Sequence, residues 1–117
     1  KFVLIASTSA LRPSPRSASY AASKAGAVMA FRSLDLQYAS KGVRFPVVML
    51  GPIHTDMWEG KMTSLVPLPE TAAKKIAAFA VSRRSRLFYP FVTTTALRLS
   101  AFLPDRVFAA LSSSFLK

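Results

Sequence analysis

Tyr20 and Lys24 are the residues of this sequence whose types and spacing most directly suggest chemistry. Because they are four positions apart, a helix would project both side chains from one face, one turn from each other. An ammonium beside a phenol favours the phenolate form, which lowers the pKa of a tyrosine from its reference value of about 10. A tyrosine in that setting can exchange a proton with a carbonyl or hydroxyl group near neutral pH. The pair therefore predicts acid–base chemistry, whereas an ordinary surface pair is the alternative that the same spacing allows.

Ser7 is the next candidate, because it lies thirteen residues before Tyr20 at the end of an apolar run. The run, residues 2–6, is short, continuous and partly β-branched, which predicts a buried parallel strand. Side chains at the carboxyl end of such a strand emerge at a ligand crevice. Ser9 would point to the same face of an extended strand end and is the alternative, but the spacing to Tyr20 favours Ser7.

Apolar runs and segments with a helical period alternate along the chain. We predict strands over residues 2–6, 43–50 and 86–90, and helices over residues 20–40, 69–82, 93–102 and 104–116. Ser19 is a candidate N-cap for the first helix, and Gly42 suits the position that follows its end. Pro46 is unusual inside a central strand and indicates a bulge or an edge position. The alternation of strands and helices predicts an α/β fold with a parallel sheet and right-handed crossovers.

The composition indicates one folded domain and excludes several kinds of site. The chain has 117 residues, of which 51% are hydrophobic and 18% charged, a balance that is typical of a globular domain. It contains no cysteine, which excludes disulfides, thiolate zinc sites and a cysteine nucleophile. With a single histidine, His54, and five carboxylates, we expect no metal site built from protein ligands alone.

The net charge of +11 suggests an anionic partner. No run of Lys and Arg is interleaved with aromatic residues as in a groove for single-stranded nucleic acid, so we expect no nucleic-acid partner. The C-terminal segment, residues 87–116, is rich in Phe, Leu and Ala and contains Arg98 and Arg106. This segment could make peripheral contact with a membrane surface. The favoured alternative is that its helices cover a substrate cleft or form a dimer contact.

The order of these features resembles that of the short-chain dehydrogenase/reductase family. The matching segments are residues 5–10 (Ile-Ala-Ser-Thr-Ser-Ala), 19–26 (Ser-Tyr-Ala-Ala-Ser-Lys-Ala-Gly), 42–44 (Gly-Val-Arg) and 51–57 (Gly-Pro-Ile-His-Thr-Asp-Met). The interval from Ser7 to Tyr20 is the usual one in the family, and Ala-Ser-Lys-Ala is very typical after its tyrosine. The resemblance covers residues 1–60 closely and residues 69–90 more loosely.

The resemblance implies a Rossmann-like, doubly wound α/β fold, of which this chain holds the C-terminal part. Residues 1–90 would form three parallel strands with flanking helices, and residues 91–117 would form a helical C-terminal extension of the same domain. The family also carries a glycine-rich phosphate loop, which the four glycines of this chain do not form. Since Lys1 rather than Met opens the sequence, next to an apolar run, we expect the downstream part of a longer protein, inactive by itself.

Three catalytic residues carry over from the family by their positions in this sequence. Tyr20 would be the general acid/base at the substrate oxygen. Lys24 would stabilise its phenolate and hydrogen-bond the hydroxyl groups of the nicotinamide ribose, so both residues would also contact the cofactor. Ser7 would hold the substrate oxygen close to C4 of the nicotinamide, where hydride moves. The implied function is an NAD(P)-dependent oxidoreductase that interconverts an alcohol and a ketone or aldehyde, with NADP slightly favoured over NAD as the cofactor.

The resemblance also places Gly51, Ile53 and Thr55 along the nicotinamide, with Ile53 and Thr55 near its carboxamide. The family usually has Pro-Gly at this strand end, whereas here Pro52 follows Gly51, so the proline is shifted by two positions. Thr55 is also a candidate helix N-cap. His54, which falls among these residues, is interpreted as a loop residue.

The loop before the second predicted helix suggests a class of substrate. We expect the loop of residues 58–68 to border the cleft, and its Trp58, Met62, Leu65 and Val66 suggest a small apolar alcohol or carbonyl substrate. A homo-oligomer is expected for the complete protein. The alternative to an enzyme is a half-fold without catalysis that serves as a binding or membrane-surface module.

Overall fold

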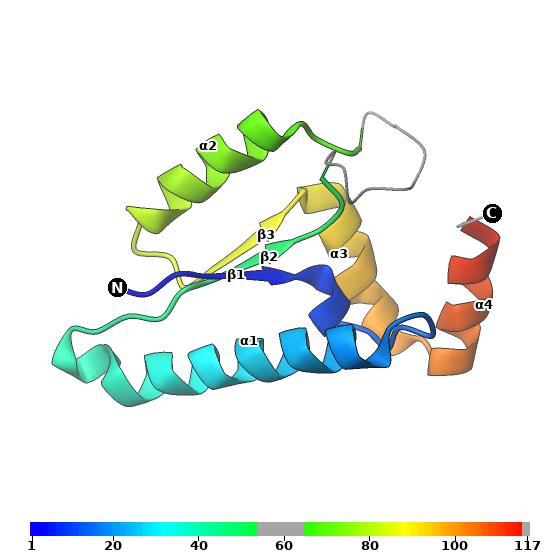
Figure 1. Cartoon of the computed structure of the whole chain (residues 1–117), viewed down its shortest axis with the longest axis horizontal. Coiled ribbons are helices and arrows are strands. Elements are labelled where there is room, and N and C mark those ends of the chain that lie inside the picture. Colours follow the sequence, from blue (N-terminus) through cyan, green and yellow to red (C-terminus); the bar gives the residue numbers. More distant parts are fainter. Residues whose placement is uncertain (54–64, 116–117) are drawn as a thin grey trace.

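The computed structural model describes residues 1–53 and 65–115, and it consists of one parallel sheet with helices on both faces (Figure 1). The strands are β1 (Leu4–Ser7), β2 (Val47–Leu50) and β3 (Arg86–Tyr89). The α-helices are α1 (Ala18–Tyr38), α2 (Pro69–Ala80), α3 (Phe91–Leu99) and α4 (Asp105–Phe115). Short 3-10 helices are η1 (Thr8–Ala10), η2 (Ala39–Lys41) and η3 (Ser100–Phe102). The predicted α/β fold, a partial Rossmann-like sheet with a helical C-terminal part, is therefore confirmed.

The strands lie in the order β1-β2-β3, and both pairs are parallel. Their register places Ser7 beside Leu50 and Leu50 beside Tyr89, so all three strands end in one row. Within the described residues, β1 pairs only with β2 and forms an edge of the sheet. The predicted burial of this strand is therefore wrong: only Ala6 is buried, and Ile5 is 44% exposed. The shared row of strand ends creates a single edge at which side chains from separate segments can meet.

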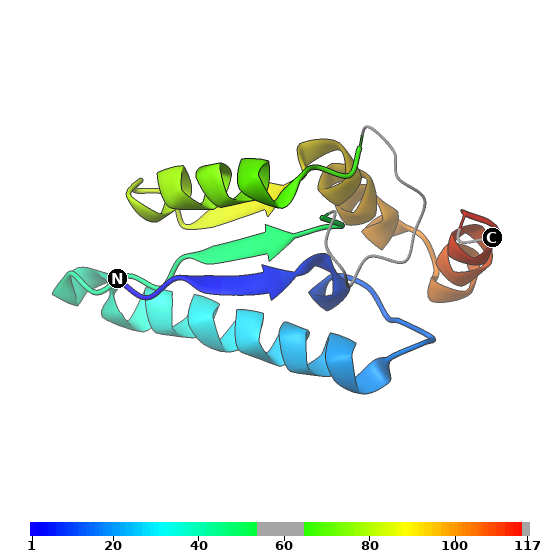
Figure 2. The same ribbon diagram turned by 45° about the horizontal axis from the view of Figure 1, so that its top comes forward.

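The two faces of the sheet are covered by different helices. Helices α1 and α3 lie on one face and α2 lies on the other (Figures 1 and 2). Successive residues of the central strand point to opposite faces. Val47 and Met49 therefore pack with Phe31 of α1, whereas Val48 packs with Phe79 of α2. All three β2 residues are almost completely buried, which explains the continuous apolar run in the sequence.

Two further local predictions are wrong, and one is confirmed. Pro46 lies just before β2 rather than inside it, and its carbonyl accepts a hydrogen bond from the backbone N–H of Leu4 (3.0 Å), so the proline interrupts no strand. The N-cap of α1 is Ser17, not Ser19, and its side chain makes no capping bond. Gly42 ends the helix as predicted and has a φ of 77°, a left-handed conformation that favours glycine.

A clamp around the Asp35 carboxylate joins the far end of α1 to the start of β2. Arg44 donates two hydrogen bonds to this carboxylate, from Nε (2.8 Å) and from Nη2 (3.0 Å), and the backbone N–H of Phe45 donates a third (2.8 Å). Nη2 of Arg44 also donates to Oγ of Ser85, which precedes β3. The bonds from Arg44, and then the bond from Phe45, hold the pKa of the Asp35 carboxyl below its ordinary value.

Gly51 follows β2 and lies against the beginning of α3. A Cβ atom on Gly51 would stand 3.1 Å from Cδ of Pro90 and 3.3 Å from Oγ1 of Thr93. The N–H of Gly51 donates to the carbonyl of Tyr89 (2.7 Å), which keeps the backbone in this position. Thr94, which is fully buried, anchors α3 here by donating its hydroxyl to the carbonyl of Pro90 (2.6 Å). The close packing at this point therefore favours glycine, because a Cβ atom would push Pro90 and Thr93 away.

The Asp35 clamp predicts a pH-dependent contribution to stability. Because the folded-state pKa of Asp35 is lowered, its stabilisation is complete above the ordinary value of 3.8 and is lost as the pH falls through the lowered value. We therefore expect Asp35→Asn to lower the midpoint of urea unfolding at pH 7, with the two midpoints converging below about pH 4. Glu70→Gln removes the same charge from the first turn of α2 and is the control. If Glu70→Gln lowers the unfolding midpoint as much as Asp35→Asn does, the effect comes from net charge and not from the clamp.

The packing of Gly51 predicts opposite effects for two glycine substitutions. Gly51→Ala should destabilise the protein by about 1–3 kcal/mol, because Pro90 and Thr93 must move to admit the methyl group. Gly26→Ala, inside α1 with no atom within 4 Å of the new Cβ, should stabilise by up to about 1 kcal/mol. Urea unfolding of the two variants measures both changes. A Gly51→Ala protein as stable as Gly26→Ala would contradict the packing argument.

Candidate functional site

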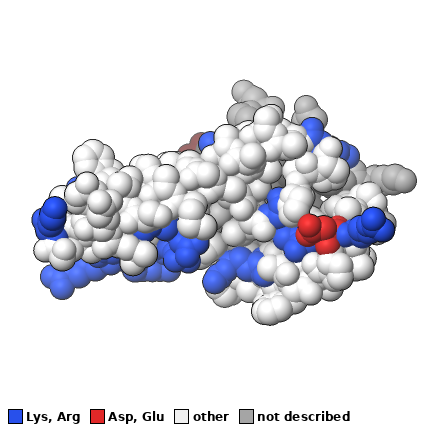
Figure 3. Space-filling view, turned by 90° about the horizontal axis from the view of Figure 1, so that it is seen from below, with Lys and Arg blue, Asp and Glu red and all other residues white. Residues whose placement is uncertain are grey.

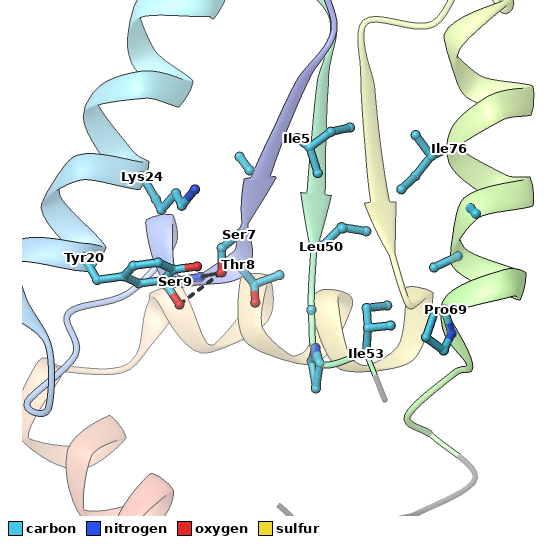
Figure 4. A pocket seen from close by; sticks show the side chains of 15 residues that line it. Ile5, Ser7, Thr8, Ser9, Tyr20, Lys24, Leu50, Ile53, Pro69 and Ile76 are labelled. Atoms are coloured by element: carbon cyan, nitrogen blue, oxygen red, sulfur yellow. Dashed lines mark hydrogen bonds between the residues drawn. The ribbon is translucent and has the colours of Figure 1, made fainter. Parts of the chain in front are cut away.

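A cleft of about 710 Å³ opens where the strands end, between the first half of α1 and the first half of α2 (Figure 4). Its floor is apolar and includes Ile5, Leu50, Ile53 and Ile76. Its polar side chains come from β1, η1 and α1, and are Ser7, Thr8, Ser9, Tyr20 and Lys24. The cleft therefore combines an apolar floor with a group of hydroxyls and one amine on one side. This volume and composition are typical of small-molecule sites.

Ser7 and Ser9 lie together because the chain turns immediately after β1. Ser7 is the N-cap of η1, and its Oγ accepts a hydrogen bond from the backbone N–H of Ser9 (3.1 Å). The Ser7 hydroxyl also donates to Oγ of Ser9 (3.1 Å). The two serines thus meet through a capping turn and not by alternation along an extended strand end, as the sequence suggested. Both line the cleft, so the geometry leaves either serine in reach of a ligand there.

Tyr20 enters the same side of the cleft from the first turn of α1. Its ring points toward the pair of serines, and 42% of its surface is exposed (Figure 4). Among the residues that the structure describes, none forms a hydrogen bond with its hydroxyl. The phenol is therefore free to hydrogen-bond a ligand in the cleft.

Lys24 lies one turn after Tyr20 and faces the same cleft. Its Nζ atom stands 5.5 Å from the centroid of the Tyr20 ring, within the range of a cation–π contact. No acidic residue is found among the described residues that line the cleft. The ammonium of Lys24 is the charged group of this lining, and it gives the polar side of the cleft a positive potential.

The segment after β2 forms the end of the cleft. Gly51, Pro52 and Ile53 line it, so two of the three residues predicted to contact a nicotinamide are brought to the site. The third, Thr55, lies outside the described residues, as does His54. Gly51 has a packing role beside α3 as well, which accounts for a glycine at this position without any ligand.

The wall formed by α2 was not anticipated from the sequence. Pro69, Ala72 and Ile76 line the cleft opposite Tyr20, whereas the sequence indicated only an amphipathic helix there. Leu65 and Val66, predicted to border the cleft, do not line it, and Trp58 and Met62 lie outside the described residues. Pro69 indicates in the sequence where α2 begins, but the position of that helix beside the strand ends is decided by tertiary packing.

The described residues include no group of three or more His, Cys, Asp or Glu side chains that could hold a metal ion. The polar side chains that line the cleft are hydroxyl groups, a phenol and an amine. Such a set can bind an oxygen atom, donate a proton to it and stabilise the resulting anion.

Comparison with known proteins agrees with this arrangement. The sequence profile of the family described as short chain dehydrogenase matches residues 1–65, which is 65 of the 117 residues. The matched segment contains β1, α1 and β2, and with them Ser7, Tyr20, Lys24 and Gly51. A search of curated proteins found no match. Because the profile covers more than half of the sequence, the chain belongs to the short chain dehydrogenase family.

Proposed function

We propose that the cleft is the catalytic part of an NAD(P)-dependent oxidoreductase that interconverts an alcohol and a ketone or aldehyde. The observation that carries this proposal is the free phenol of Tyr20, which points toward Ser7 and Ser9 with Lys24 over its ring. Membership of the short chain dehydrogenase family supports oxidoreductase chemistry in general. The roles of Tyr20, Lys24 and the two serines are part of our proposal.

Tyr20 acts as the general acid/base in this proposal. In the reducing direction its hydroxyl donates a proton to the carbonyl oxygen while a hydride adds to the carbonyl carbon, which yields the alcohol. In the oxidising direction the phenolate takes the proton from the alcohol oxygen. The ammonium of Lys24 lies close to the ring and stabilises the phenolate. This phenolate is the product of proton donation in the reducing direction and the base in the oxidising direction.

The serine pair positions the substrate oxygen. Ser7 and Ser9 share one hydrogen between their oxygens, so the pair keeps a further hydroxyl hydrogen to donate to a substrate. A carbonyl oxygen held there would lie on the side of the cleft toward which the Tyr20 ring points. We assign the main role to Ser7, on its spacing from Tyr20, and a supporting role to Ser9. The apolar floor around Ile5 and Leu50 favours a small apolar alcohol or ketone as substrate.

The residues of the cleft fit one end of a nicotinamide cofactor. Lys24 can hydrogen-bond the ribose hydroxyls, and Gly51 and Ile53 offer backbone and apolar surface to the ring, with Thr55 as a further candidate. When bound, the nicotinamide supplies or accepts the hydride. The four glycines of the chain form no phosphate loop, so the rest of the cofactor requires contacts from another segment. The proposal covers both NAD and NADP.

Substitution of the phenol tests the catalytic assignment. In a protein in which this chain is combined with a segment that binds the rest of the dinucleotide, Tyr20→Phe should lower turnover at least about a hundredfold, because the acid/base is removed. Cofactor affinity should change little. Lys24→Ala should reduce both turnover and affinity, since it removes the phenolate-stabilising charge and the ribose contacts.

Tyr38→Phe is the matched control for this experiment. Tyr38 belongs to the same helix but packs against Phe45, with ring centroids 6.2 Å apart, away from the cleft. Its substitution should leave turnover unchanged. Near wild-type turnover in Tyr20→Phe, or equal losses in both variants, would end the assignment.

Cofactor titration tests whether the 117-residue chain is competent by itself. We expect no saturable binding of NADH or NADPH up to millimolar concentration, because the cleft holds only the nicotinamide end. A displacement of reacting groups by about 1 Å can cost a hundredfold in rate, so turnover should also be absent. Cofactor fluorescence, with folding checked by circular dichroism, gives the readout. Saturable binding, or reduction of a ketone that Tyr20→Phe abolishes, would show that the chain alone is sufficient.

A further inference from the structure

The C-terminal part of the chain exposes many large apolar side chains. Seven of them are at least 38% exposed: Phe91, Val92, Leu99, Phe102, Leu103, Val107 and Leu111. They come from α3, η3 and α4, except Leu103, which lies between η3 and α4, and we refer to them together as the C-terminal apolar surface. Phe102, in the short η3 helix, is 89% exposed. So much exposed apolar surface on one segment indicates an interaction site.

Helix α4 stands at one end of the molecule, beside the loop that follows η1 (Figures 1 and 2). Arg12 of this loop holds it there by donating two hydrogen bonds to the carbonyl of Leu103, both 3.3 Å long. The guanidinium also pairs with Asp105 (3.2 Å) and lies 4.4 Å from the centroid of the Phe108 ring. Phe108 thus faces the protein, while Val107 and Leu111, one turn apart, stay exposed.

The C-terminal apolar surface does not cover the cleft. The described residues that line the cleft belong to the first 76 positions, and none belongs to α3, η3 or α4. The most exposed of its side chains, such as Phe91 and Phe102, project outward from helices. The expectation that these helices close over a substrate is therefore not supported by the described residues, and the surface needs another occupant.

Basic residues surround this surface. Three of them are exposed: Arg16 in the loop beside α4, Arg98 on α3 and Arg106 on α4. The side chain of Arg12 is almost completely buried and holds α4 in place. Asp105 is the acidic residue of this end, and it is paired with Arg12. Figure 3 shows the same pattern, with basic side chains on several sides of the acidic group near α4. The guanidinium of Arg98 lies 4.1 Å from the centroid of the Phe88 ring, and Arg98 is exposed beside the apolar residues of α3.

We infer that the C-terminal apolar surface binds the surface of an anionic lipid bilayer. Helices that combine an apolar face with basic residues insert the apolar side chains at the interface, while the cations meet the lipid headgroups. A second copy of the chain fits less well, because a symmetric contact would bring two sets of uncompensated arginines together. No helix in the described part of the chain is long and apolar enough to cross a membrane, so the contact would be peripheral.

Flotation with lipid vesicles tests the contribution of the exposed apolar side chains to this binding. We expect the chain to float with vesicles of phosphatidylcholine and phosphatidylglycerol at low salt and to bind pure phosphatidylcholine vesicles much less. The double variant Leu99→Ser and Phe102→Ser should weaken binding at least about tenfold, since both side chains leave the lipid. Leu36→Ser, at an 85% exposed position on α1, is the matched control and should bind as the wild type does. All of these positions are exposed, so folding, checked by circular dichroism, should be retained.

The salt dependence of vesicle binding tests the contribution of the arginines. Binding should weaken as salt rises, because ions screen charge attraction within roughly 8 Å at physiological ionic strength. Arg106→Gln should weaken it, whereas Arg83→Gln, in the turn between α2 and β3, should not. Absence of binding to anionic vesicles at low salt would overturn the inference. So would equal losses in the Leu36 control, or a concentration-dependent dimer that the Leu99/Phe102 variant abolishes while vesicle binding stays unchanged.

Discussion

The parallel pairing of β1 with β2, in the register that places Ser7 beside Leu50, is the constraint on which the site depends. Each strand is only four residues long, so a shift by one residue would move Ser7 to the other face of the sheet. The register is set by the buried central strand, because Val47 and Met49 fit the face toward α1 and Val48 fits the face toward α2. One row of strand ends then carries the serine turn of β1 and the Gly51 turn of β2 into the same cleft.

Helix α1 brings Tyr20 and Lys24 to the same row of strand ends. It runs along β1 and β2, with Tyr20 near one end and the Asp35 clamp near the other. Because a helix is stiff, the bonds from Arg44 and Phe45 to Asp35 fix its direction relative to the sheet about four turns away from Tyr20. The position of the phenol beside the serines is thus supported by an ion pair at the opposite end of the sheet.

The cleft and the C-terminal helices carry different chemistry. The cleft is lined by hydroxyl groups and Lys24 over an apolar floor, which suits an oxygen-bearing substrate and one end of a dinucleotide. Beyond it, α3 and α4 present apolar side chains among arginines and suit a lipid surface. Arg12 connects the two regions, because its loop leads directly into α1 and its guanidinium holds α4. A lipid-bound C-terminal surface would therefore place the start of α1 close to the bilayer.

Local sequence determined the elements of this fold and the polar side of the cleft. The apolar run of β1, the Tyr20–Lys24 spacing and the terminal Gly42 are all short-range patterns, and each predicts its local structure without knowledge of the rest. The tertiary structure decided the contacts between segments that are distant in the sequence. The wall of α2 opposite Tyr20, the preference for glycine at position 51 beside Thr93, and the docking of α4 by Arg12 each join residues far apart in sequence. Such contacts follow from how the helices pack on the two faces of the sheet, and no single segment encodes that packing.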